Sequence, residues 1–282
     1  MTIGVVQTRT GLDANANARA LADAVDRLAG RGATLVFTPE MCGLLDRDGA
    51  RLARAAQTED AEPTLEALRA VAAARRIAIS VGSLAIRVPG VERLFNRGFA
   101  IGPDGAIRAR YDKLHLFDVD LPDGQRYRES AGFAPGERLS VVRFDEAALG
   151  LAICYDLRFP ALHAALARAG AEIIAQPAAF TVPTGEAHWH VLLRARAIET
   201  GCFIVAAAQA GRHADGRETY GHSLVVDPWG RVLLDMGTEP GEALAEIDLG
   251  EVARVRARIP SLEHARPLPA VEVVDARARV TA

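Results

Sequence analysis

The stretch Leu149–Pro160, which reads Leu-Gly-Leu-Ala-Ile-Cys-Tyr-Asp-Leu-Arg-Phe-Pro, decides the fold. Its first residues are small or branched and apolar, which is typical of a short buried strand in an α/β sheet. Cys154 stands where this strand ends and polar residues begin. A free thiol is only a few per cent ionised near pH 7, so a nucleophilic cysteine needs a base or a cation beside it. A cysteine after an apolar run is by itself more often a packing residue, so the rest of the chain must supply the helpers.

Two further stretches supply charged groups. Thr34–Glu40 (Thr-Leu-Val-Phe-Thr-Pro-Glu) predicts a second buried strand, which delivers the carboxylate of Glu40 just beyond a proline that stops the ladder. Lys113, in Tyr-Asp-Lys-Leu-His, is the only lysine among 33 basic residues. A compact ammonium on a flexible stem differs from a guanidinium, which favours a chemical role for Lys113.

The composition limits the classes of function. The chain has 282 residues, half of them apolar, and a net charge of -3, so no basic field indicates a nucleic acid or an anionic membrane as partner. No signal-type segment and no apolar run of membrane length is present, which predicts a cytoplasmic protein. The three cysteines, Cys42, Cys154 and Cys202, are spaced for neither disulfides nor zinc, so we expect reduced thiols and, for Cys42 and Cys202, packing roles.

The order of expected elements predicts an α/β fold. A strand at residues 3–7, a helix at 15–29 and the strand ending at Glu40 form an opening β-α-β unit. We expect a helix at 64–75, a strand at 77–83 and a hairpin of 99–102 with 107–111, so that Lys113 follows a hairpin. The region from 116 to 136 predicts a long loop, which contains Glu129.

The second half of the chain repeats the first. Gly32–Pro39 aligns with Gly170–Pro177 at an offset of 138, each after an alanine-rich helix, which predicts two similar α/β halves. We further expect a strand at 203–208 and a strand pair of 223–226 with 231–234. The spacing also predicts one helix over Gly185–Thr200, capped by Thr184, with a buried side made of Trp189, Leu192, Leu193 and Ile198.

Other chemistries find little support in the sequence. His188 and His190 are two residues apart on the predicted helix and therefore point apart, so no metal site is expected. No glycine-rich phosphate loop opens a helix, so no nucleotide cofactor, and no cofactor at all, is expected.

The motifs around Glu40, Lys113 and Cys154 together resemble those of the nitrilase, or carbon-nitrogen hydrolase, superfamily, over about residues 3 to 267. The resemblance implies a four-layer α-β-β-α sandwich with two pseudo-symmetric halves. It also implies one hydrolase domain over residues 1–250 and a C-terminal arm over 251–282 at the interface of a homodimer or larger homo-oligomer.

The resemblance further implies a mechanism of amide hydrolysis. Cys154 would attack the amide carbon, Glu40 would act as general base, and Lys113 with the backbone N–H of Tyr155 would stabilise the oxyanion. Glu129 matches a second glutamate of the family, which would hold Lys113 or the attacking water. The substrate-binding residues are predicted to be Tyr155, Arg158, Phe180 and Thr181.

Longer matches around residues 187–200, 206–213 and 220–230 resemble the Nit-type amidases that release 2-oxoglutarate and Cys-Gly from deaminated glutathione. An ω-amidase acting on 2-oxoglutaramate and a non-catalytic interaction module on the same fold remain alternatives. Arg158, Arg212 or His213 would meet substrate carboxylates. Two positions depart from the family: His190 replaces a usual Glu, and the tail lacks the usual Arg-Arg-Pro-Asp ending.

Overall fold

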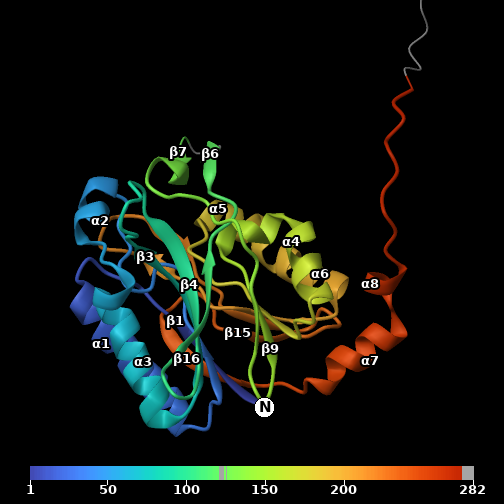
Figure 1. Ribbon diagram of the computed structural model, residues 1–282, viewed down its shortest axis with the longest axis horizontal. Helices are drawn as coiled ribbons and strands as arrows, with labels where there is room; N and C mark the ends of the chain where they lie inside the picture. Colours follow the sequence, from blue (N-terminus) through green and yellow to red (C-terminus); the bar gives the residue numbers. More distant parts are fainter. Residues whose placement is uncertain (121–123, 125, 275–282) are drawn as a thin grey trace, which may run out of the picture.

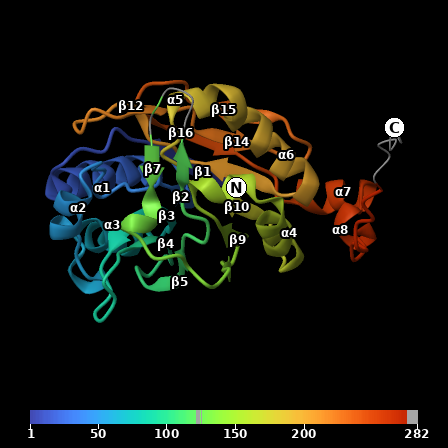
Figure 2. The same ribbon diagram turned by 90° about the horizontal axis from the view of Figure 1, so that it is seen from above.

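The computed structural model describes residues 1–120, 124 and 126–274. Two six-stranded sheets face each other, and a pair of helices covers the outer face of each sheet (Figures 1 and 2). The helices outside the first sheet are α1 (Ala14–Gly30) and α3 (Pro63–Arg75), and those outside the second are α4 (Pro160–Arg168) and α6 (His190–Thr200). The predicted α-β-β-α sandwich is therefore confirmed.

The strands of each sheet come almost entirely from one half of the chain. The first sheet has the order β16-β1-β2-β3-β4-β5, with the bounds β16 Gly241–Glu246, β1 Thr2–Gln7, β2 Leu35–Phe37, β3 Ala78–Ile86, β4 Phe95–Ile101 and β5 Ile107–Asp112. The second has the order β15-β14-β11-β10-β9-β8, with β15 Val232–Asp235, β14 Leu224–Val226, β11 Phe203–Ala206, β10 Ile173–Ala175, β9 Ala148–Leu151 and β8 Val141–Arg143.

The two halves repeat one β-α-β frame. Ile3 of β1 pairs with Leu35 of β2, and Leu149 of β9 pairs in the same parallel sense with Ile173 of β10. Each first strand also carries a glycine at which an added Cβ would press on a leucine of the covering helix: Gly4 on Leu28 at 3.0 Å and Gly150 on Leu166 at 3.2 Å. The offset of 138 between Leu35 and Ile173 confirms the predicted internal repeat.

Alternation along β2 shows how the layers are held together. Leu35 and Phe37 belong to the apolar core between the sheets, whereas Val36 belongs to the core under α1 and α3. Successive side chains of a strand point to opposite faces, so a strand buried on both faces is apolar throughout. Burying each such side chain stabilises the fold by about 1.5–3 kcal/mol.

The predicted helix at 185–200 is wrong in its first part. The structure has α5 (Val182–Thr184), a π-helical turn (Gly185–Trp189) and then α6. The Thr184 hydroxyl bonds to the Thr181 hydroxyl at 2.8 Å and caps no helix. Ile198 is 53% exposed, whereas Leu193 is buried. The two residues are five positions apart, which rotates Ile198 by about 140° around the helix axis, away from the buried face.

The predicted loop at 116–136 contains regular structure. Short strands β6 (Asp118–Asp120) and β7 (Arg126–Arg128) pair antiparallel, and the 3₁₀ helix η2 (Glu129–Ala131) follows. The markers Pro122 and Asp123 lie outside the described residues. Tertiary contacts thus give order to a polar segment whose sequence indicates turns only.

The remaining elements are short. They are α2 (Gly49–Ala55), η1 (Glu59–Ala61), η3 (Cys154–Arg158), β12 (Ala210–Arg212) with β13 (Glu218–Tyr220), α7 (Gly250–Arg258) and α8 (Ser261–His264). Arg256 of α7 donates to the carbonyls of Thr200 (3.1 Å) and Ala171 (2.8 Å), so the start of the predicted arm packs on the second half. Within the described residues, no helix combines the length and apolarity needed to cross a membrane.

Candidate active site

Glu40 lies three residues beyond the end of strand β2 and is 4% exposed. Its neighbour strand approaches so closely that a Cβ on Gly82 would lie 2.1 Å from the Thr38 carbonyl oxygen. Oε2 of Glu40 accepts from the backbone N–H of Ala179 at 2.8 Å, across the two halves of the molecule. Oε1 accepts from Asn96 at 2.9 Å and from the Lys113 ammonium at 2.9 Å. The carboxylate is therefore held at both oxygens.

Lys113 directly follows β5, as the hairpin prediction required, and is 2% exposed. Its backbone N–H donates to the Asn96 carbonyl at 2.9 Å, and its own carbonyl accepts from Gly136 at 2.9 Å. The side chain contacts Glu40 and both oxygens of Glu129, at 3.0 Å and 2.8 Å. One ammonium thus bridges two carboxylates in a place where water is largely excluded.

Glu129 opens η2, and the short hairpin of β6 and β7 carries it back to Lys113. The Phe117 backbone N–H donates to its Oε2 at 2.7 Å, and the Asn96 amide donates to its Oε1 at 3.0 Å. The structure thus brings Glu40, Lys113 and Glu129 together. Of the two partners that the resemblance left open for Glu129, the structure shows the lysine contact.

Cys154 begins η3 in a left-handed backbone conformation, with φ of +47°. A non-glycine residue in this region costs about 1–2 kcal/mol, which the surroundings must offset. The Cys154 N–H donates to the Pro177 carbonyl at 2.8 Å, and the Gln176 amide donates to the Cys154 carbonyl at 3.1 Å. These bonds fix the turn and keep the side chain, 8% exposed, next to Glu40.

The pKa directions define the charge state of the cluster. Burial raises the pKa of Glu40, but the Lys113 ammonium and hydrogen bonds from Lys113, Cys154 and Asn96 outweigh it and leave that pKa below its usual value. Burial and the nearby Glu40 charge raise the pKa of Cys154 well above that of a free thiol. Burial lowers the pKa of Lys113, yet the charges of Glu129 and Glu40 raise it further, so the ammonium stays charged.

Asn96 and Asp156 belong to the site and were missed by the sequence analysis. Asn96 donates to both carboxylates through one amide nitrogen. Asp156 accepts from the backbone of Ile153 (2.9 Å) and from the Tyr111 hydroxyl (2.7 Å), which ties the cysteine turn to the strand that carries Lys113. The adjacent Cys-Tyr-Asp was a signal for Asp156, whereas nothing in the sequence singled out Asn96.

Of the predicted substrate-binding residues, Tyr155 and Arg158 share η3 with Cys154, and Phe180, next to Thr181, packs under Arg158; these four residues are called the wall beside Cys154. The Tyr155 ring packs edge-on against Phe117 and Phe159. The Arg158 guanidinium lies over the Phe180 ring at 5.6 Å and reaches His188 Nδ1 at 3.3 Å. Thr181 is 7% exposed, and its hydroxyl is taken by Thr184.

The suggestion that His213 meets a substrate carboxylate is wrong. His213 is 4% exposed, and its two ring nitrogens bond to the Thr10 carbonyl (3.1 Å) and the Thr219 hydroxyl (2.8 Å). Its neighbour Arg212 is exposed, so its role stays a prediction. Cys42 and Cys202 are buried free thiols, as expected, and burial raises the pKa of Cys42 to about 12.

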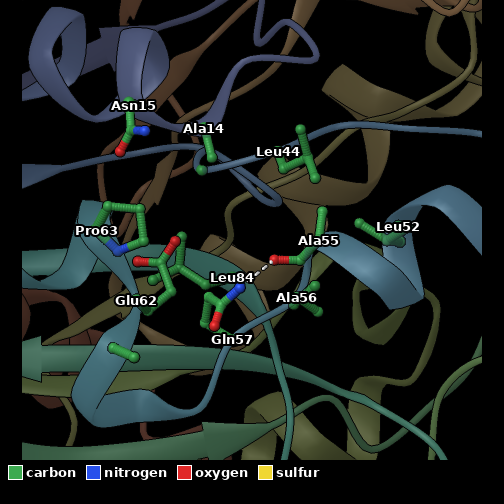
Figure 3. Close-up of a pocket in the computed structure, with 13 residues that line it drawn as sticks. Ala14, Asn15, Leu44, Leu52, Ala55, Ala56, Gln57, Glu62, Pro63 and Leu84 are labelled. Atoms are coloured by element: carbon green, nitrogen blue, oxygen red, sulfur yellow. Dashed lines mark hydrogen bonds between the residues drawn. The ribbon is translucent and has the colours of Figure 1, made fainter.

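A separate cavity of about 280 Å³ lies beside α2 and the start of α3 (Figure 3). Its walls include Leu44, Gln57, Glu62 and Leu84 and none of the residues around Cys154. Burial raises the pKa of Glu62, and the carboxylate is already used as the cap of α3, where it accepts from Leu65 N–H at 2.6 Å. Geometry and charge therefore place the candidate active site at Cys154 and not in this cavity.

Comparison with known proteins agrees with the fold. The family model of carbon-nitrogen hydrolases matches residues 2–257. A deaminated glutathione amidase of Synechocystis sp. is 42% identical over 85% of this chain and 89% of its own length. The human deaminated glutathione amidase is 41% identical over 94% of this chain and 82% of its own.

Among solved structures, the NitFhit protein of C. elegans superposes with a TM-score of 0.87 at 38% identity, covering 94% of this chain. The present chain spans 65% of that longer protein. These matches show that the chain belongs to the carbon-nitrogen hydrolase family. It is accordingly an enzyme that hydrolyses carbon–nitrogen bonds.

Proposed function

We propose that the protein is an amidase that cleaves deaminated glutathione to 2-oxoglutarate and Cys-Gly, with Cys154 as nucleophile. One observation carries the proposal: an ionised, buried Glu40 contacts both the Lys113 ammonium and the Cys154 thiol. A base that contacts both a cation and a protonated nucleophile is the minimum set for acyl transfer through a thioester.

The first step joins sulfur to carbon. Glu40 takes the thiol proton as Sγ of Cys154 attacks the amide carbon, and the carbonyl oxygen becomes an oxyanion that Lys113 and the Tyr155 N–H stabilise. Glu40 then gives the proton to the amide nitrogen, the C–N bond breaks, and Cys-Gly leaves as a free amine. The acyl group stays on sulfur as a thioester.

The second step uses the same carboxylate again. Glu40 takes a proton from water, the resulting hydroxide attacks the thioester carbon, and the C–S bond breaks. The sulfur recovers its proton, and 2-oxoglutarate leaves. Glu129 keeps Lys113 aimed at Glu40 throughout, since both of its oxygens contact the ammonium.

The opposite pKa directions of Glu40 and Cys154 determine the timing of the first step. A carboxylate with a lowered pKa is a weak base, and a thiol with a raised pKa is a weak acid. Transfer before attack is therefore uphill, so the proton moves as the S–C bond forms. Binding of the substrate carbonyl next to Lys113 supplies the driving force.

The choice of substrate rests on the relatives that carry this activity in their names and on the wall beside Cys154. Arg158 is the cationic group of that wall, and it has no carboxylate partner among the described contacts. A guanidinium that is free to pair suits the carboxylate of a 2-oxo acid or of a dipeptide end.

The test measures release of 2-oxoglutarate from deaminated glutathione and from 2-oxoglutaramate, for the wild type and for Cys154→Ala. We expect a larger kcat/KM for deaminated glutathione and no turnover by the variant. A strong preference for 2-oxoglutaramate would replace the proposal with an ω-amidase. Turnover by Cys154→Ala would remove the thiol mechanism itself.

We propose further that residues 1–250 form the hydrolase domain and that the arm from 251 onward lies at the interface of a cytoplasmic homo-oligomer. Supporting this, Leu268, Val271, Val273 and Val274 are 74–94% exposed in the single chain. Several large apolar side chains exposed on one short segment favour burial against a partner. Light scattering of the full chain and of a chain ending at residue 264 tests this, and equal masses would contradict it.

A further inference from the structure

Three potential metal ligands meet on the surface of the second half, away from the residues that hold Cys154. They are His190 at the start of α6, His222 between β13 and β14, and Asp235 at the end of β15. One ligand atom of each lies within 4.8 Å of the others. Figure 2 shows α5, α6, β14 and β15 on the same side of the molecule.

The spacing of the donor atoms is close to what a tetrahedral ion requires. His190 Nε2 lies 3.0 Å from Asp235 Oδ2, and His222 Nδ1 lies 2.9 Å and 3.2 Å from the two oxygens of Asp235. Ligands on bonds of about 2.0–2.2 Å in a tetrahedral site are separated by roughly 3.4 Å. The ligand atoms, the two imidazole nitrogens included, lie within 4.8 Å of one another, so side-chain rotation on the order of an ångström brings the cluster to this spacing.

The backbone around His222 holds its ring in place before any ion arrives. His222 has a φ of +51°, its N–H donates to the Gly237 carbonyl, and its own carbonyl accepts from Trp189 Nε1 at 2.7 Å. Its ring stacks on Tyr220 with 4.5 Å between centroids. A histidine in the left-handed backbone conformation, with its N–H and carbonyl both hydrogen-bonded, is locally strained, and such strain is frequent at functional sites.

Asp235 and His190 are also held. Asp235 accepts hydrogen bonds from His190 at 3.0 Å, from His222 at 2.9 Å and from the Gly237 N–H at 2.9 Å, which fix its carboxylate. His190 follows the π-helical turn, an irregularity that is frequent at functional sites. The side chains of His190, His222 and Asp235 are 34%, 23% and 35% exposed, so an ion can reach them from solvent.

We propose that His190, His222 and Asp235 form a binding site for a divalent transition-metal ion of the Zn²⁺ class. Two imidazoles and one carboxylate are borderline ligands that favour Zn²⁺, Co²⁺ or Ni²⁺ over Mg²⁺. Binding needs the lone pairs of His190 Nε2 and His222 Nδ1, so each neutral ring carries its proton on the other nitrogen. Water completes the shell.

The site joins segments that also border the candidate active site. The Tyr220 N–H donates to the Phe180 carbonyl at 2.9 Å, and the Phe180 ring packs on Trp189, directly before His190. Phe180 in turn follows Ala179, whose N–H binds Glu40. An ion at the cluster therefore stabilises the wall that carries Phe180 without contacting Cys154.

The experiment uses Co²⁺ and Zn²⁺ with full-length protein freed of metal by a chelator. The background is Cys154→Ala, so that the reactive thiol cannot compete for the ion. We expect one Co²⁺ per chain with visible ligand-field bands and no thiolate charge-transfer band. Zn²⁺ at a hundredfold excess over its Kd should raise Tm by about 5 °C, and Mg²⁺ at the same concentration should not.

The variants His190→Gln and Asp235→Asn should each weaken Zn²⁺ binding at least about 10-fold, because even outer partners of a metal site contribute that much. His188→Gln is the matched control, since His188 lies two residues away and contacts Arg158. It should leave the affinity unchanged. Equal Zn²⁺ affinity in His190→Gln and the parent, or no binding by the parent, would overturn the proposal, and neither result bears on the amidase reaction.

Discussion

The two halves of the molecule have the same frame and carry different groups at the strand ends. Ile3 of β1 occupies the same place in the first half as Leu149 of β9 in the second. Counting five residues on from each, Thr8 is the structural equivalent of Cys154. The offset of 138 places Ala178 where the first half has Glu40. Lys113 directly follows β5, whereas Met236 directly follows β15.

The two halves show that one β-α-β frame can carry different reactive groups at its strand ends. Each half alone holds only part of the reactive set, because the carboxylates and the ammonium come from the first half and the thiol from the second. Hydrogen bonds across the halves join them: the Ala179 N–H binds Glu40, and the Gln209 amide donates to the Glu40 carbonyl at 2.9 Å. The site therefore exists only where the two repeats face each other.

The largest expected effect tests the difference between Cys154 and Thr8. Cys154→Ala should lower kcat/KM at least about 10⁴-fold, because the thioester cannot form. Thr8→Ser, at the equivalent position, should change it no more than about threefold. Steady-state kinetics measures both.

A buried cysteine elsewhere provides the control for this loss. Cys42→Ala removes another buried thiol, and it should keep most of the activity. If Cys42→Ala were as inactive as Cys154→Ala, general disruption of the fold would explain the loss. The difference between Cys154 and Thr8 would then be no evidence for a nucleophilic cysteine.

The second test makes the ends of β5 and β15 alike. Lys113→Met gives the position after β5 the same residue type as Met236, which follows β15. The substitution leaves Glu40 and Glu129 buried without a cation. Breaking such a pair costs about 3–5 kcal/mol of the free energy of unfolding. Loss of the oxyanion donor should lower kcat about 10²–10³-fold.

Urea unfolding and kinetics check the Lys113 variant together. Lys113→Arg is its conservative partner: it keeps the charge but not the compact geometry, so it should recover most of the stability and little of the activity. Full activity in either variant would show that the ammonium is structural only.

The third test concerns the pH dependence of stability. The pKa of Glu40 is lowered on folding, so its carboxylate contributes stability above about pH 4.5, and this is lost as the pH falls through the folded value. Glu40→Gln should therefore flatten the acid limb of the unfolding free energy below about pH 4.5, and urea unfolding measured across the acid range checks it.

Glu62 supplies a control with the opposite sign. Its pKa is raised by burial, so its contribution is fully present below about pH 4.5 and is lost as the pH rises. Glu62→Gln should make the free energy of unfolding fall more steeply as the pH is lowered, whereas Glu40→Gln should make it fall less steeply. The same slope in both variants would contradict the pKa directions.

The smallest expected effect lies at Arg158 in η3, the 3₁₀ turn that follows β9 but has no described counterpart after β1. Arg158→Gln should raise KM for deaminated glutathione about 10-fold and leave kcat within about twofold, because the guanidinium binds a carboxylate that does not react. Arg212, the exposed residue of β12, is the other candidate. A rise in KM in Arg212→Gln and not in Arg158→Gln would assign the substrate carboxylate to Arg212.

Much of the fold followed from local patterns. The strand ends at Glu40 and Cys154, the hairpin before Lys113 and the repeat at offset 138 were all predicted, since apolar runs and turn residues act over a few positions. The helix at 185–200 was predicted without its π-helical turn, because periodicity alone does not register one extra residue per turn. The hairpin of β6 and β7 was missed for the opposite reason, since its polar residues are ordered by contacts such as Arg128 with Asp120, and by Tyr127 packing on Phe117.

The sequence by itself determined the α/β frame and the kinds of reactive group at its strand ends. The tertiary structure decided which of these groups meet: Lys113 and Glu40 are 73 residues apart, and Ala179 and Glu40 are 139 apart. It also decided that His213 is buried while His190, His222 and Asp235 gather at the surface. The reason is physical: propensity and periodicity are set by near neighbours, whereas the distance between two charges depends on how whole layers pack.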